Sequence, residues 1–191
     1  MKLFLITILF TVSAFAGEFS KDFSFKDFNE AKGADSYLKF TVESTKVGLF
    51  SSDVDGYVMS FKAVASENKN ELKKLVVSFL ANSMNTDHES RDEKLHNFCM
   101  GAQDFPEIKV SIEGPLKVTG EKQVVDATFN IRGKNKTSPI SLILKREGKQ
   151  IYAEGKTVLS LKELEIPDPS IAVAKLSDDI RIEFKLSVDE K

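Results

Sequence analysis

The chain is 191 residues long and almost neutral, with 27 Lys and Arg residues against 29 Asp and Glu residues. Nucleic-acid-binding proteins present a net basic field to the phosphate backbone, so this charge balance argues against a nucleic-acid partner. The length suffices for one domain with a hydrophobic core, and the single cysteine, Cys99, excludes an internal disulfide.

Residues 1–16 are typical of a secretory signal peptide. Lys2 supplies a positive charge, an apolar run follows it, and Ala14-Phe15-Ala16 has the small-x-small pattern at which such peptides are cleaved. We therefore expect cleavage before Gly17, with residues 17–191 forming one exported, soluble domain. The apolar run is too short to span a bilayer. No cysteine lies directly after the cleavage site, where a lipid anchor would be attached.

The rest of the chain repeats an alternation of apolar and polar residues, which predicts β-strands with one face in a core and the other in water. Short turn sequences separate the strands, so we expect one domain with no long linker. One-faced antiparallel strands must be stacked or closed, which predicts an all-β barrel or sandwich of about eight strands. The alternating segments are a strand near Phe23 and Phe25, and residues 38–42, 57–65, 75–81, 108–112, 125–131, 140–144, 151–161 and 180–188.

Two short helices are expected to interrupt these strands. Ser90-Arg91-Asp92-Glu93 has the pattern of a capping box, and Thr86-Asp87-His88-Glu89 offers a competing box one turn earlier. Gly101 is expected to end this helix. The second helix would be capped by Asp168 and include Pro169 and residues 172–176. At helical spacing, the buried face of the first helix would consist of Leu95, Phe98 and Cys99.

Three motifs occur in order along the chain. Thr86–Leu95 contains the pattern Arg-Asp-x-x-Leu, Phe105-Pro106-x-Ile108 leads into a predicted strand, and Phe129-x-Ile131-x-Gly133 precedes Lys136. In order and spacing, these motifs and the last alternating segment resemble the YceI-like family of exported lipid-binding proteins, from about Ser36 to Val188. The chain departs from the family pattern at Asn97-Phe98-Cys99-Met100, at Asn135, and between Ser160 and Ile166.

The resemblance implies a lipocalin-like, eight-stranded antiparallel barrel with one or two short helices. It also implies a periplasmic protein whose long apolar tunnel binds a polyprenyl, quinone-like or fatty acyl amphiphile for carriage or storage. Such a protein would be no enzyme, would need no cofactor, and would contact the membrane only transiently. Alternation alone does not distinguish a hollow interior from a filled one, so a solid-core interaction module stays open as an alternative.

Aromatic residues on the inward faces are the candidate lipid contacts. The chain has 15 Phe, 3 Tyr and no Trp, so its apolar faces carry few polar groups, as a tunnel for an alkyl chain requires. The same rings would equally fill a solid core. The predicted lipid-binding residues are Phe40, Val42, Met59, Phe61, Phe79, Phe129, Leu142 and Phe184.

Other candidate sites have simpler interpretations. Asp92, His96 and Cys99, with His88 nearby, have helical spacing suited to zinc, but no pattern supplies a complete ligand set, so we predict no metal site. Arg91 and Asp92 are expected to brace the helix on the barrel rim, with contact to a ligand headgroup as the alternative. Lys134 and Lys136 are expected in a solvated turn, with an anionic headgroup or membrane surface as the alternative. No nucleophile elbow or phosphate loop occurs, which leaves an enzyme with an unrecognised site as the remaining rival.

Overall fold

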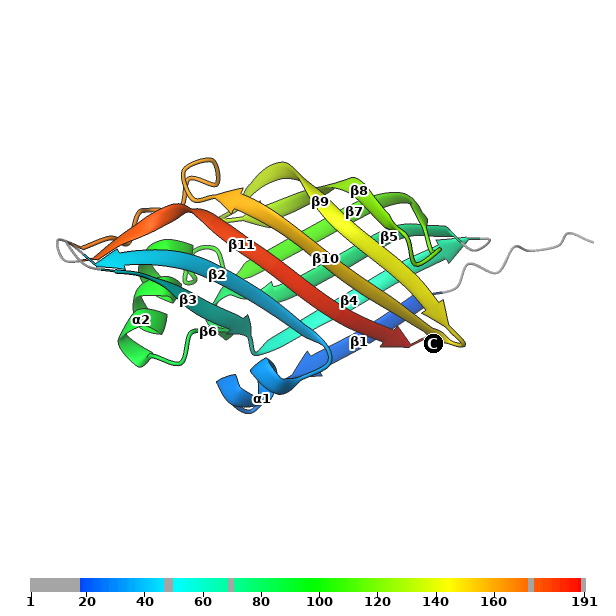
Figure 1. Ribbon diagram of the computed structural model, residues 1–191, viewed down its shortest axis with the longest axis horizontal. Coiled ribbons are helices and arrows are strands. Elements are labelled where there is room, and N and C mark those ends of the chain that lie inside the picture. Colours follow the sequence, from blue (N-terminus) through cyan, green and yellow to red (C-terminus); the bar gives the residue numbers. More distant parts are fainter. Residues whose placement is uncertain (1–17, 47–49, 69–70, 172–173, 190–191) are drawn as a thin grey trace, which may run out of the picture.

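The structure is a computed structural model that describes residues 18–46, 50–68, 71–171 and 174–189. These residues form one antiparallel sheet in the order β1-β4-β5-β7-β8-β9-β10-β11-β2-β3-β6 (Figure 1). The eleven strands are β1 (Glu18–Ser24), β2 (Tyr37–Lys46), β3 (Ser51–Val58), β4 (Ser60–Asn68), β5 (Glu71–Leu80), β6 (Met84–Asn85), β7 (Glu107–Lys117), β8 (Lys122–Ile131), β9 (Lys134–Glu147), β10 (Gln150–Ser160) and β11 (Ala174–Asp189).

The sheet curls until its two edges approach each other. The chain passes from β3, near one edge, directly into β4, near the other, through the single residue Met59. The Met59 N–H donates to the Ser83 carbonyl (2.7 Å), and the Met59 carbonyl accepts from the Phe25 N–H (2.8 Å). This corner joins the strands into a curled, barrel-like sheet whose inner face can enclose a core.

The predicted all-β, antiparallel class is confirmed, but the count of eight strands is not. Residues 57–65 were expected to form one strand, whereas the chain turns at Met59 and divides them between β3 and β4. Ser51–Gly56 was not expected to be a strand because it is polar and ends in glycine; its pairing with β2 supplies the missing stabilisation. The two-residue strand β6 is too short to leave a periodic signal.

The first predicted helix forms, although neither capping box does. Helix α2 (Glu89–Lys94) follows His88, which makes no side-chain cap, and continues as a π-helical turn over Leu95–Met100. Gly101 ends this turn with a φ of 59°, in the left-handed region, as predicted. The described ranges also contain α1 (Phe28–Gly33), capped by Asp27, and a single 3₁₀ turn over Ala81–Ser83.

The second predicted helix is wrong where the structure describes it. Residues 174–176 begin β11, in which Leu176 pairs with Ser44 of β2. The Asp168 carboxylate accepts from the Ser170 N–H (2.9 Å), so it closes a local turn instead of capping a helix. The ladder to β2 therefore outweighs the local helical signal. Residues 172–173 lie outside the described part.

One half of the barrel is filled by the protein's own side chains. The largest side chains of this half are almost completely buried, namely Phe19, Leu72, Leu116, Leu142, Leu144, Ile151 and Val188. This packing supplies a core at one end of the barrel.

The predicted signal peptide lies outside the described residues, as does its cleavage point before Gly17. Among the helices of the described ranges, none combines the length and apolar character needed to cross a bilayer.

Candidate functional site: an apolar cavity in the barrel

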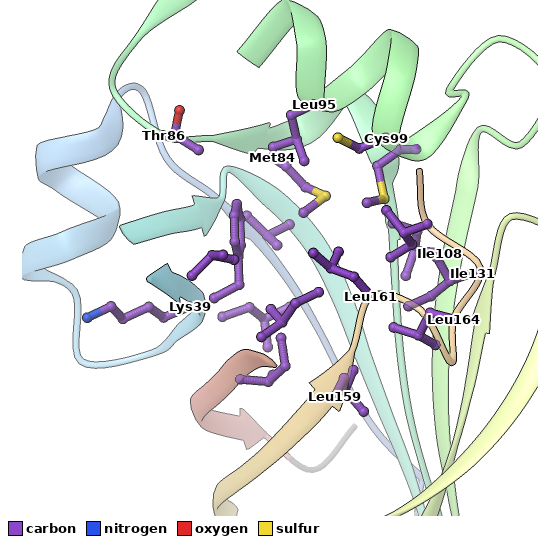
Figure 2. A pocket seen from close by; sticks show the side chains of 18 of the residues that line it. Lys39, Met84, Thr86, Leu95, Cys99, Ile108, Ile131, Leu159, Leu161 and Leu164 are labelled. Carbon is purple, nitrogen blue, oxygen red and sulfur yellow. The ribbon is translucent and has the colours of Figure 1, made fainter. Parts of the chain in front are cut away.

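The second half of the barrel encloses a cavity of about 520 Å³ (Figure 2). This volume falls within the ~300–1,000 Å³ that is usual for small-molecule sites. Most of its wall is apolar, contributed by strands, by the helix and by the loop after β10. The apolar lining consists of Leu38, Phe40, Val42, Val54, Val58, Leu75, Val77, Phe79, Met84, Leu95, Cys99, Met100, Ile108, Val110, Ile112, Phe129, Ile131, Ile140, Leu159, Leu161, Leu164, Ile166, Pro169, Ile171, Ala174, Leu176, Ile180, Ile182 and Phe184.

The cavity ends against the packed half of the barrel. On β11, Ile180, Ile182 and Phe184 line it, whereas Leu186 and Val188 on the same face are buried in the core. The far end of the barrel also carries ion pairs: Arg146 pairs with Glu67, and the Lys21 ammonium lies 3.4 Å from the Asp189 carboxylate. The cavity is therefore a pocket in one half of the barrel, whereas the family resemblance implied a long tunnel.

The mouth of the cavity lies between α2 and the segment that leads into β11. The exposed lining residues gather there: Ser90 and Arg91 from α2, and Ile171, which is 54% exposed. The Lys94 ammonium reaches across from α2 and donates to the Pro169 carbonyl (2.5 Å). A ligand would therefore enter beside the helix, with its tail directed toward Phe184.

A helix and a loop cover the cavity between its mouth and the strands. Leu95 and Cys99 extend inward from the helix, while Leu161 and Leu164 extend from the loop after β10 (Figure 2). Phe98, predicted to share the buried face, is instead 49% exposed. The π-helical turn explains this difference, because its wider winding brings residue i+5 rather than i+3 back onto the face of Leu95.

Both ends of this helical segment are fixed to the barrel. Thr86, only 4% exposed, accepts from the Arg91 guanidinium through its hydroxyl (2.7 Å) and its carbonyl (2.5 Å). Its N–H and hydroxyl donate to the Asp92 carboxylate (2.8 and 2.5 Å). At the other end, the Arg132 guanidinium donates to the Cys99 carbonyl (2.9 Å). The predicted role of Arg91 and Asp92 as a brace is confirmed.

The hairpin lysines are engaged in ion pairs with the covering loop. Lys134 pairs with Glu165, and the Lys136 ammonium lies 3.1 Å from the Glu163 carboxylate. The turn is exposed to solvent, as expected. Its two lysines also form ion pairs that connect the β8–β9 hairpin to the loop that carries Leu164.

The residues considered for zinc each have another partner or environment. The His96 Nε2–H donates to the Met84 carbonyl (2.6 Å), and Asp92 is bound to Thr86. Cys99 is buried, and burial raises the pKa of its thiol. No group of three or more His, Cys, Asp or Glu side chains suited to a metal occurs within the ranges that the structure describes.

Five of the predicted lipid-contacting residues line the cavity, and three do not. Alternation correctly indicates the inward face of a strand, but it carries no information on depth within the barrel. Phe40, Val42, Phe79, Phe129 and Phe184 line the cavity. Met59 forms the β3–β4 corner, Phe61 stacks on Phe23, and Leu142 is buried in the packed half.

Sequence reasoning missed the lining that comes from outside the regular strands. Leu161, Leu164 and Ile166 line the cavity from the loop after β10. Their spacing follows neither a strand nor a helix, so only their apolar character in an otherwise charged loop could have indicated burial. Contact of any of these residues with a lipid stays a prediction.

Comparisons with known proteins agree with this architecture. A polyisoprenoid-binding domain from Saccharophagus degradans superposes with a TM-score of 0.63 at 15% identity, covering 82% of this chain and 94% of that one. BcnA of Burkholderia cenocepacia gives a TM-score of 0.63 at 13% identity, covering 79% of this chain and 95% of that one. The YceI protein of Campylobacter jejuni gives 0.64 at 22% identity, covering 77% and 94%. At these low identities the superpositions show a shared fold and no more.

No curated protein sequence matches the chain. The YceI-like domain family, by contrast, matches residues 6–188, which is nearly the whole chain. The helix motif around Arg91 and Asp92, the Phe105-Pro106 step and the hairpin at Gly133 all fall within this range. The chain therefore belongs to the YceI-like family.

Proposed function

We propose that this protein is a binding protein that holds the tail of one long-chain amphiphile in the barrel cavity, for carriage or storage. The observation that supports this most is the apolar cavity itself, which leaves about 520 Å³ open beside an otherwise densely packed core. A well-packed domain has few voids larger than a water molecule, so an opening of this size favours a ligand. The family resemblance and the polyisoprenoid-binding domain of similar fold point to a polyprenyl, quinone-like or fatty acyl tail.

Burial of the tail would supply the affinity. Each methylene transferred from water into the cavity contributes about 0.8 kcal/mol and needs no directional partner. The polar lining residues Ser90, Arg91 and Lys94 belong to the helix at the mouth, where the headgroup of an inserted amphiphile would lie. The tail would therefore meet the apolar wall while the headgroup stays near water.

The proposal includes export. Residues 1–16 have the pattern of a signal peptide, and the family resemblance favours the periplasm. A carrier in that compartment would meet membranes only transiently, to collect or release its ligand.

The two alternative functions, a solid-core interaction module and an enzyme, would require different features of the same barrel. A solid-core interaction module would have no use for the cavity. An enzyme would need an activated reactive group at the reacting position, whereas burial raises the pKa of the Cys99 thiol in the lining, and the charged residues of the described lining are Lys39, Arg91 and Lys94. A binding role uses every feature of the pocket without adding an unassigned reaction.

The test combines extraction with a pair of matched variants. Organic extraction of the purified mature protein, followed by mass spectrometry, should yield one long-chain species at close to one per protein. Val110→Phe, which fills the cavity from β7, should abolish this recovery. Val124→Phe, the same change at a position 71% exposed, should not.

Absence of a bound species, combined with no uptake of added fatty acid or prenol by the wild-type protein, would contradict the proposal and favour the solid-core module. Equal recovery from Val110→Phe and Val124→Phe would place the lipid outside the cavity and would also contradict it.

A further inference from the structure

The charges around the cavity all have one sign. The charged side chains among its described lining residues are Lys39, Arg91 and Lys94, and no described carboxylate is among them. An apolar pocket bordered only by cations favours a ligand whose polar end is negative, because a neutral headgroup gains less from the charge than an anion does. The three cations differ in the partners that they already have.

The ammonium group of Lys39 is ion-paired outside the cavity. Its ammonium lies 2.9 Å from the Asp55 carboxylate and 6.0 Å from the centre of the Tyr57 ring. Figure 2 shows its amino group directed away from the labelled apolar side chains of the cavity. Lys39 is therefore neutralised within the fold and does not face a ligand.

Arg91 is largely occupied by the brace. Its Nε donates to the Thr86 hydroxyl and its Nη2 to the Thr86 carbonyl. Replacing it would disturb the helix as well as any ligand, so Arg91 contributes positive charge at the mouth but is a poor residue on which to test a ligand contact.

Lys94 differs from both. It lies half-buried in the last turn of α2. Its ammonium donates to the neutral Pro169 carbonyl (2.5 Å) and lies 5.9 Å from the centre of the exposed Phe98 ring. Within the described ranges no carboxylate forms an ion pair with it. An ammonium has three donors, so the bond to Pro169 leaves two for another acceptor.

The acidic residue whose charge reaches Lys94 already has partners. The Asp168 carboxylate accepts from the hydroxyl and the N–H of Ser170. Those bonds, and more weakly the nearby Lys162 and Lys94 ammonium groups, lower the pKa of Asp168. Asp168 lies on the exposed side of the segment before β11 and is not part of the cavity wall.

We propose that Lys94 binds the anionic headgroup, a carboxylate or a phosphate, of an amphiphile whose tail occupies the cavity. The inference rests on the proposed function and adds the chemical class of the ligand. Lys94 lies where the headgroup of an inserted tail must end, and partial burial strengthens a charge-assisted hydrogen bond compared with open solvent.

The experiment compares ligands that share a tail and differ in charge. Palmitate is compared with palmitamide, and farnesyl phosphate with farnesol, by calorimetric titration of the mature protein. The variants are Lys94→Gln, which removes the charge, and Lys94→Arg, which keeps it. The control is Lys175→Gln, which removes an exposed lysine of β11 at the same end of the barrel that does not line the cavity.

The wild-type protein should bind at least one anionic ligand about tenfold more tightly than its neutral partner, as expected for a charge-assisted bond at a partly exposed site. Lys94→Gln should abolish this preference and leave the affinity for palmitamide and farnesol unchanged. Lys94→Arg and Lys175→Gln should keep the preference. A preference in only one pair would support the proposal and identify the headgroup as a carboxylate or as a phosphate.

Three results would overturn the inference: equal affinity of the wild-type protein for charged and neutral partners, an undiminished preference in Lys94→Gln, or an equal loss for both members of a pair. The last would show that Lys94 acts on the shape of the pocket through Pro169. In each case the neutral ligands still bind the wild-type protein, so the proposed function stands. Failure of all four ligands to bind the wild-type protein would instead contradict the proposed function.

Discussion

The ring of Phe40 lies directly against Gly56, its partner across the β2–β3 ladder. A Cβ atom placed on Gly56 would lie 2.0 Å from Cζ of Phe40, closer than any real contact. The same relationship holds between Phe184 and Gly155, where the added Cβ would lie 2.4 Å from the ring. Both rings line the cavity, so each glycine allows an aromatic side chain to lie against the wall and keeps the interior open.

Gly56→Ala should therefore reduce the space available to a ligand. The added methyl group forces the Phe40 ring away from the wall and toward the open cavity. We expect about a tenfold loss of affinity for a long-chain ligand, with a fall of about 1–2 kcal/mol in the free energy of unfolding. Ligand titration and urea denaturation measure the two effects.

The matched control for this change is Gly33→Ala, because nothing lies within 4 Å of a Cβ at that position. It should leave ligand affinity unchanged. Unaltered affinity in Gly56→Ala would show that the ligand does not reach the region of Phe40.

Thr86→Val should destabilise the helix that covers the cavity. The change keeps the shape of the side chain but removes the hydroxyl that donates to Asp92 and accepts from Arg91. Two charged groups then lose a buried partner, which we expect to lower the free energy of unfolding by about 2–3 kcal/mol. Hydrogen exchange of the amides of α2 should accelerate in parallel.

Thr128→Val provides the comparison for Thr86→Val, since the Thr128 hydroxyl makes only a long contact (3.5 Å) with Thr137 on the sheet surface. We expect Thr128→Val to change the free energy of unfolding only slightly. Equal losses from the two variants would refute the special role of Thr86.

Asp55 should contribute a pH-dependent part of the stability. Burial alone would raise the pKa of this carboxyl, but hydrogen bonds from Lys39 and Thr41 outweigh burial and lower it from 3.8. Because the pKa is lower in the folded state, the stabilisation is complete above pH 3.8 and is lost as the pH falls through the folded-state value.

Denaturation of the wild-type protein and Asp55→Asn, at neutral pH and well below pH 3.8, measures this contribution. The wild-type protein should lose more free energy of unfolding between the two conditions than the variant. Asp126→Asn, which removes an exposed carboxyl of β8, should behave like the wild-type protein. An identical acid loss in the wild-type protein and Asp55→Asn would contradict the prediction.

Cys99 should report whether the cavity is occupied. Burial raises the pKa of this thiol from 9.0, although Lys94 and Arg132 act in the opposite direction. Because the thiolate is the reactive form, modification by a small thiol reagent should be slow at neutral pH and accelerate above pH 9.0. Bound palmitate should slow the reaction further, because Cys99 lines the cavity.

The rate of modification can be followed by mass spectrometry at one site, since Cys99 is the only cysteine of the chain. Lys122→Cys in a Cys99→Ala background, with the thiol on the exposed side of β8, should react at a rate that palmitate does not change. If bound palmitate failed to protect Cys99, the ligand would have to lie away from the π-helical turn.

Local patterns were informative wherever one strand or one helix end acts on its own. The alternation from Ile180 to Val188 predicted an inward face because a strand places successive side chains on opposite sides. Gly101 ended the helix as expected, since a left-handed residue there favours glycine. The paired Arg91 and Asp92 indicated a brace because charged side chains at a helix start need partners.

The failures occurred where distant segments compete with local preference. Residues 174–176 were expected to be helical, yet pairing of Leu176 with Ser44 made them a strand. Ser51–Gly56 has little of the alternation that predicts a strand. It is part of β3 because it pairs along its length with β2. Leu161 and Leu164 line the cavity from a loop that is ion-paired to Lys134 and Lys136 of the β8–β9 hairpin, a contact between distant segments that no local pattern indicates.

By itself, the sequence determined the class of the fold, its family, and which face of most strands turns inward, since these depend on residue type and spacing along one segment. Only the tertiary structure decided what each inward side chain faces. Phe61 and Phe79 have the same alternation, but Phe61 stacks on Phe23 from a neighbouring strand while Phe79 faces open space. Whether an inward side chain meets another side chain or a cavity depends on what the curled sheet brings opposite it, and that is a property of the whole sheet rather than of any strand.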